Sequence, residues 1–165
     1  MITADFISRE IEQIKGQRYQ LLIIPERKVN KPEILGCLKQ LNIPILNLSL
    51  ILAEQLKSVP EQKRPREVSS TLRQVIHRYD TDVICFEKME YLFDPELKQD
   101  PLRLLESLSG NKVLMVLWPG DVQDNTLTYA TPEHPEFYQK QGYEQYIMRY
   151  IKGECRNEVQ RPYSL

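Results

Sequence analysis

The chain has few of the residues that build metal sites and disulfide frameworks. Its 165 residues include three cysteines and two histidines. The cysteines, Cys37, Cys85 and Cys155, are odd in number and far apart, and the histidines, His77 and His134, are isolated from one another. This spacing fits neither a zinc site nor a set of disulfides. We therefore expect no bound metal.

The sequence also lacks a long apolar segment and a large net charge. No apolar run approaches the ~20 residues that a membrane-spanning helix needs, and charges interrupt the N-terminus where a secretory signal needs an apolar core. The net charge is −1, so contact with nucleic acid would need a local basic patch. We expect a cytoplasmic protein without membrane contacts, folded as a single domain over residues 1–165.

Short apolar runs alternate with segments of helical spacing along the chain. This alternation predicts an α/β fold, three-layered, with a mainly parallel sheet of about four to five strands. An N-terminal helix within residues 1–18 and a C-terminal extension at 139–165 flank it, and the tail over 137–151 is tyrosine-rich and predicted to be helical in part. The strands are expected at 21–24, 45–48, 83–86 and 113–118, with a short one at 127–129, and the helices at 4–15, 32–41, 67–79, 102–108 and, capped by Asn47 or Ser49, up to residue 56.

Glycine is missing from the turn that follows the first expected strand. Residues 25–32 have the length and position of a phosphate-binding loop, G-x-x-x-x-G-K-[ST], and keep its lysine as Lys31. Pro25 and Asn30 replace the two glycines, and Pro32 replaces the hydroxyl residue that holds magnesium. Glycine lets the backbone approach a phosphate, and Pro25 also removes an N–H donor.

Two interpretations of this loop follow. In the first, Lys31 reaches a phosphate as a point charge, Asn30 adopts the left-handed conformation of the lost glycine, and ATP binds weakly without a metal, with Lys28 nearby. In the second, the segment is a solvated strand-to-helix turn, Lys28 and Lys31 lie in water, and no cofactor binds. The second is favoured, because three of the four informative positions have changed.

Two acidic residues follow the third expected strand. Additional-strand ATPases place an acid at the end of this strand to hold magnesium and a second acid to polarise the attacking water. Glu87 has the first position and Glu90 lies near the second. The extra methylene of Glu87, compared with aspartate, would displace a bound metal, and a solvated acidic turn is the alternative. Glu87 and Glu90 are therefore candidate catalytic residues. The sequence as a whole nevertheless favours a protein that is not an enzyme.

Residues 57–66 combine two prolines with four basic side chains. Prolines at this density predict an exposed loop. Such a loop either contacts nucleic-acid phosphates or is a plain surface segment. The candidate nucleic-acid residues are Lys57, Lys63, Arg64 and Arg66.

Residues 118–138 combine prolines and aromatics near the expected ligand side of the sheet. His134 could act as an acid or base, but no serine or cysteine nucleophile stands beside it in the sequence. Aromatic side chains are enriched at the energetic centres of interfaces. We therefore favour a partner-binding surface over an acid–base site, with ordinary packing of a closing segment as the alternative.

Five short segments carry a family likeness: 92–97 (LFDPEL), 100–105 (DPLRLL), 118–120 (WPG), 127–130 (LTYA) and 134–138 (HPEFY). Together they resemble the BrxF family, small P-loop-containing proteins of type 3 BREX phage-defence systems. The likeness covers about residues 21–138 and is most specific from 93 onward. It implies a P-loop NTPase-like fold of the additional-strand (ASCE/AAA) type and a place among the subunits of a defence system.

The resemblance also indicates where this chain departs from the family. The family's loop usually ends in Gly-Lys-Thr or Gly-Lys-Ser, and its third strand usually ends in aspartate. Lys31 and Glu90 carry over directly. The departures are Pro25, Asn30, Pro32 and Glu87.

We therefore expect a non-catalytic or weakly nucleotide-binding subunit of a bacterial BREX-type system that acts through protein–protein assembly. Its partners would be other defence-system subunits, and through them nucleic acid. Self-association is left open. The alternatives are an active ATPase subunit and a DNA-binding adaptor that uses residues 57–66.

Overall fold

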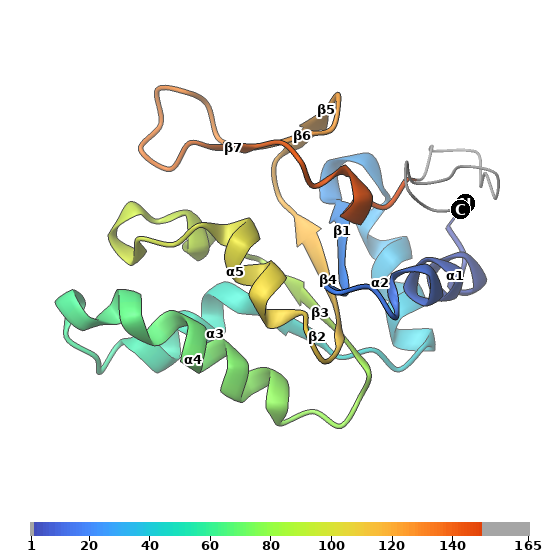
Figure 1. Ribbon diagram of the computed structural model, residues 1–165, viewed down its shortest axis with the longest axis horizontal. Helices are drawn as coiled ribbons and strands as arrows, with labels where there is room; N and C mark the ends of the chain where they lie inside the picture. The colour runs from blue at the N-terminus through green and yellow to red at the C-terminus, as the bar shows by residue number, and fades with distance from the viewer. Residues whose placement is uncertain (1, 150–165) are drawn as a thin grey trace.

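The structure is a computed structural model that describes residues 2–149, and it has two β-sheets (Figure 1). The main sheet is parallel, with strand order β1-β4-β3-β2. The predicted α/β class and its four main strands are confirmed; Cys155 and most of the expected C-terminal extension lie outside the described residues. The strands are β1 (Leu21–Pro25), β2 (Ile45–Asn47), β3 (Val83–Glu87) and β4 (Val113–Trp118).

Helices cover both faces of the main sheet, an arrangement compatible with a three-layer α/β fold (Figure 1). On one side lie α1 and α2, and on the other α3, α4 and α5. None of the helices in the described part of the chain is long and apolar enough to cross a membrane. The helices are α1 (Ala4–Ile14), α2 (Lys31–Gln40), α3 (Leu48–Leu56), α4 (Arg64–His77) and α5 (Pro101–Leu108).

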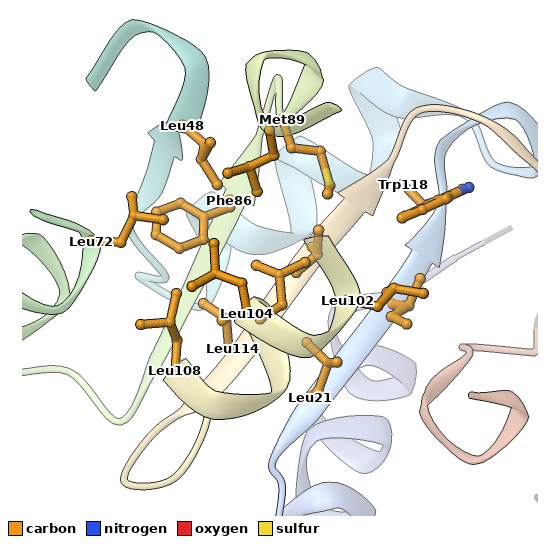
Figure 2. Close-up of a cluster of buried hydrophobic side chains, with 14 of the residues drawn as sticks. Leu21, Leu48, Leu72, Phe86, Met89, Leu102, Leu104, Leu108, Leu114 and Trp118 are labelled. Carbon is orange, nitrogen blue, oxygen red and sulfur yellow. The ribbon is translucent and has the colours of Figure 1, made fainter. Parts of the chain in front are cut away.

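The strands β1, β3 and β4 are buried on both faces because their side chains alternate between the two helical layers, whereas the edge strand β2 is only partly buried. In β1, Leu22 and Ile24 pack with α1 and α2, whereas Leu21 and Ile23 pack with α3 to α5. The second of these two clusters is the larger, and Figure 2 shows Phe86 and other members of it between the sheet and the helices. Continuous apolar runs of four to six residues are what this two-sided burial requires.

Side-chain caps begin four of the five helices among the described residues. Asn47 caps α3 by accepting a hydrogen bond from the Leu50 N–H, as one of the two sequence alternatives predicts. Thr3, Asn30 and Asp100 cap α1, α2 and α5 in the same way.

Residues 57–66 are mostly exposed, as predicted, but from Glu61 onward they are helical and not a loop. A short 3-10 helix, η2 (Glu61–Lys63), leads directly into α4, which begins at Arg64, three residues before its predicted start. Pro65 lies in the first turn of α4, where a missing N–H leaves no hydrogen bond unmade. The proline that suggested a loop therefore helps to start the helix.

A second sheet, here called the cap sheet, is antiparallel and has the order β5-β6-β7. It lies across the carboxyl end of β4 (Figure 1). The sequence predicted only its central strand, because the outer strands are three residues each and lack an apolar run. The strands are β5 (Asp121–Gln123), β6 (Thr126–Tyr129) and β7 (Tyr138–Lys140).

The cap sheet is fixed to the end of β4 by a close backbone approach. The Trp118 indole N–H donates to the Thr128 carbonyl at 3.1 Å. Gly120 lies so near the same residue that an added Cβ would be 1.7 Å from the Thr128 carbonyl oxygen. Aromatic packing completes the joint, with the Phe93 ring stacked on Tyr129 at 3.9 Å between centroids.

The segment after β7 returns to the main sheet at the free edge of β1. Ile147 forms a parallel bridge with Ile23, and the Met148 N–H donates to the Ile23 carbonyl at 2.8 Å. The predicted partly helical character of this region is limited, within the described residues, to a 3-10 turn over Glu144–Tyr146. A rudimentary fifth strand position thus lies beside β1.

We expect Gly120→Ala to lower the free energy of unfolding by about 2–3 kcal/mol, because Thr128 must move to admit the new methyl group. The matched control is Gly36→Ala in α2, where nothing lies within 4 Å of the added Cβ. That change should raise stability by about 0.5–1 kcal/mol through helix propensity. Chemical denaturation measures both; equal effects of the two changes would contradict the close approach.

Candidate functional site

The candidate site lies at the carboxyl end of β1, where parallel α/β sheets bind ligands. After Pro25 the chain makes a 3-10 turn, η1 (Glu26–Lys28), and then runs extended through Val29 into α2. Asn30 has φ −82° and ψ 107°, and no residue from 25 to 31 has a positive φ. The left-handed Asn30 of the first interpretation is therefore not found. The loop therefore lacks the alternating backbone conformation that turns successive N–H groups toward a phosphate.

Asn30 and Pro32 have structural roles at the start of α2. The Asn30 side chain accepts a hydrogen bond from the Glu33 N–H at 3.2 Å and so caps the helix. Pro32 occupies the first turn, where its missing N–H has no helical partner to lose. The substitutions that remove phosphate-loop chemistry are thus good helix-starting residues.

Lys31 is ion-paired with two carboxylates of its own chain. Its ammonium Nζ lies 2.8 Å from the Glu26 Oε1 and 3.6 Å from the Glu87 Oε1. The three side chains are 27%, 24% and 21% exposed, respectively. The Glu26 hydrogen bond raises the Lys31 pKa above its usual 10.5; partial burial opposes this shift, and the charges of both glutamates reinforce it. The expectation that Lys31 lies in water is wrong, whereas Lys28 is exposed as predicted.

The two glutamates offset an unfavourable charge arrangement. Lys31 is the first residue of α2, so its ammonium sits at the positive end of the helix dipole. A positive side chain there gains stability from a nearby anion, which a nucleotide supplies in a working phosphate-binding loop. Here Glu26 from the loop and Glu87 from the end of β3 supply it. The sequence indicated Lys31 and Glu87, but missed Glu26, whose only signal is an acid five residues before the lysine.

Glu90 is separate from this group. It is exposed at the start of η3 (Glu90–Phe93), and no ion pair joins it to Lys31 within residues 2–149. Its charge instead acts on Tyr129 of the cap sheet, whose pKa is raised first by burial and then by Glu136 and Glu90. The two candidate catalytic acids therefore face different neighbours.

The cap sheet is tied to the loop of the candidate site through one outer strand and to α5 through the other. Arg27 of the loop donates to Asp121 of β5 at 2.9 Å. Across the sheet, Lys140 of β7 donates to Asp100, the capping residue of α5, at 2.8 Å.

Among the described residues, no group of three or more histidines, cysteines, aspartates and glutamates could hold a metal ion.

The predicted basic residues straddle the connection from α3 to α4. Lys57, Lys63 and Arg66 are exposed, as a nucleic-acid contact requires. Arg64 is half-buried, and its Nε donates to the Val59 carbonyl at 2.9 Å, so it holds the turn together. The structure therefore leaves three of the four residues available to a partner.

The segment from 118 to 138 is buried at four residues, Trp118, Gly120, Val122 and Leu127, and is exposed or half-buried elsewhere. Trp118 is fully buried in the core, so its predicted role at an interface is wrong. Phe137, by contrast, is exposed. His134 lies on a turn where its Nδ1 accepts a hydrogen bond from the Glu136 N–H at 3.0 Å, which gives it a structural role.

Comparisons with known proteins give no further assignment. The chain matches no protein-family model, and neither the curated proteins nor the solved structures compared with it contain a match.

Asp100 is the polar centre of the contact between α5 and the cap sheet. It accepts hydrogen bonds from the Tyr138 hydroxyl at 2.5 Å, the Lys140 ammonium at 2.8 Å and the Arg103 N–H at 3.4 Å. Burial alone would raise its pKa, but these donors together hold the pKa below its usual 3.8. Its charge therefore stabilises the fold above that pH, and this stabilisation is lost as the pH falls through the lower, folded-state pKa.

We expect Asp100→Asn to lower the free energy of unfolding at pH 7 by about 1 kcal/mol, because the Lys140 ion pair is lost while the helix cap remains. The difference from wild type should shrink as the pH falls below 3.8. Urea unfolding at several pH values measures this. The control is Asp80→Asn at an exposed position after α4; a pH-independent deficit in Asp100→Asn would contradict the role of charge.

Proposed function

We propose that this chain is a non-catalytic, P-loop-like subunit of a BREX-type anti-phage system, similar to the BrxF family, and that it acts in the cytoplasm by assembling with other subunits. The proposal rests on the family-like segments and on a site that has the position of a phosphate loop without its chemistry.

The strand order supports the P-loop part of the proposal. In additional-strand ATPases, one strand separates the strand before the phosphate loop from the strand that ends in the acid. Here β4 lies between β1 and β3, and Lys31 and Glu87 follow β1 and β3. The parallel bridge at Ile147 adds a strand position on the outer side of β1. This order is compatible with a scaffold derived from such an ATPase.

The observation that carries the non-catalytic part is the pairing of Lys31 with Glu26 and Glu87. A phosphate at Lys31 would have to displace a carboxylate held at 2.8 Å and would then face two negative charges. It would also find no backbone cradle, because the loop is extended before α2. Both features disfavour a nucleotide at this edge of the sheet.

Calorimetric titration tests this part directly. We expect ATP and ADP, with or without Mg²⁺, to give no saturable binding up to millimolar concentration. The double variant Glu26→Gln with Glu87→Gln frees Lys31 of both charges but restores no backbone cradle, so it should still bind no more than weakly. Micromolar binding by the wild-type chain that disappears in Lys31→Ala would contradict the proposal.

The assembly part has its own test. When a tagged form of the chain is co-expressed with the remaining subunits of a type 3 BREX system, purification should recover at least one of them in stoichiometric amount. Recovery of the tagged chain alone would contradict an assembly role.

An active ATPase is the second candidate, favoured by the 3.6 Å separation of the Lys31 ammonium and the Glu87 carboxylate. A lysine and an acid that meet at one edge of the sheet are the charged groups that phosphoryl transfer uses. This candidate predicts ATP-dependent phosphate release that is lost in Lys31→Ala and reduced in Glu90→Gln. We expect release no greater than that of the Glu90→Gln variant.

A further inference from the structure

The outward face of α4 carries exposed basic side chains from one end of the helix to the other. Figure 1 shows α4 along the lower left edge of the molecule. Its apolar side, which includes Val68, Leu72 and Val75, is buried against the core. Its opposite side exposes Arg66, Arg73 and His77, and Arg78, the residue that follows the helix, is exposed as well.

The helical repeat places three of these residues in one line. Positions 66, 73 and 77 are separated by seven and four residues, which returns each side chain to nearly the same direction around a helix of 3.6 residues per turn. The line from Arg66 to His77 is about 16 Å long at 1.5 Å per residue. Ser70 lies between them and is also exposed.

Lys112, in the loop before β4, extends this line beyond the end of α4. Its ammonium donates to the carbonyls of Ile76, at 3.1 Å, and Tyr79, which fixes its charge at the carboxyl end of the helix. The side chain lines a hollow together with Arg73, His77 and Asn111. A second hollow, which shares Arg73 and His77, is lined by Gln74 and Arg78. Two adjoining concave surfaces thus present the same basic groups.

The charge of this region contrasts with that of the whole chain. Residues 57–78 contain six basic and two acidic residues, a net charge of +4, whereas the chain carries −1, so the remainder carries −5. Within residues 2–149, no ion pair involves Arg66, Arg73 or Arg78. Glu67, the acidic residue of α4, is hydrogen-bonded to the Ser70 hydroxyl. The three arginines are therefore available to the anionic groups of a partner, although Glu67 keeps its negative charge on the same helix.

We propose that the outward face of α4, extended by Lys112, binds the phosphate backbone of duplex DNA without reading its sequence. Exposed basic side chains in a line, among them Arg66 and Arg73, suit a regular row of phosphates. Among the described residues, the amides that line the hollows are Gln74 and Asn111; the arginines, which could also contact guanine, are assigned here to phosphates, and phosphate contacts carry no sequence information. This site differs from the predicted basic segment, because Arg64 is held in its turn and Arg73, Arg78 and Lys112 were not among the candidates. It does not depend on the proposed assembly role.

Fluorescence anisotropy with a labelled 20-base-pair duplex of arbitrary sequence tests the site. We count four phosphate contacts, from Arg66, Arg73, Arg78 and Lys112. A plot of the logarithm of the association constant against the logarithm of salt concentration should then have a slope of about −3.6. Arg73→Gln with Arg78→Gln removes two of these contacts, so the slope should become less steep by about 1.8 and affinity at 50 mM salt should fall about tenfold or more.

The matched control is Arg9→Gln with Lys39→Gln. It removes the same charge from exposed positions on α1 and α2, on the opposite face of the main sheet. Its affinity should stay within about twofold of the wild type, because these positions make no phosphate contact. Equal weakening by both double variants would show that general charge, not the α4 face, governs binding and would overturn the proposal.

Three further binding measurements identify the ligand of the α4 face. Single-stranded DNA and duplex RNA of the same length should bind more weakly than duplex DNA, and polyglutamate should not compete at equal charge concentration. Preference for either other nucleic acid, or full competition by polyglutamate, would overturn the assignment to duplex DNA. Absence of binding at 50 mM salt would overturn it as well.

Discussion

The Lys31 ammonium is held between the carboxylates of Glu26 and Glu87, and the edge of the sheet is organised around that contact. A positive side chain at the first residue of α2 needs a neighbouring anion, since the helix dipole already makes that end positive. In a working phosphate loop the anion arrives with the nucleotide. In this chain it is built in, and the two glutamates join the loop after β1 to the end of β3.

The cap sheet gives the same edge a second layer of fixed contacts. Gly120 lets β6 come within backbone contact of the end of β4, and Trp118 is buried beneath it. Asp100 and Arg27 then tie the outer strands to α5 and to the loop. A region that ligand-binding α/β proteins leave open at the carboxyl ends of their strands is here joined to a separate sheet. This closure agrees with a structural rather than catalytic role for the subunit we propose.

Continuous apolar runs made the main strands predictable, because residues such as those of Val83–Glu87 are buried on both faces of a sheet. The outer cap strands were missed because β5 and β7 are short and mostly polar, and only pairing with β6 defines them. The start of α4 was predicted three residues too late for a different reason. Proline is common both in loops and in the first turn of a helix, and Pro65 was interpreted as a loop residue. Glu26 was missed because its role depends on a side chain five residues away, a spacing that no helical or strand repeat indicates.

The central claim is that Glu26 and Glu87 neutralise the charge of Lys31 within the chain. The pKa of Lys31 is its most direct test. Nitrogen-detected NMR of selectively labelled lysine ammonium groups, assigned with Lys31→Arg, reports the pKa of this side chain and its response to nucleotide. We expect a pKa above the usual 10.5, lowered in Glu26→Gln, and no change in the signal when Mg-ATP is added. A Lys31 signal that moves on addition of Mg-ATP, together with an ordinary pKa in its absence, would contradict the central claim.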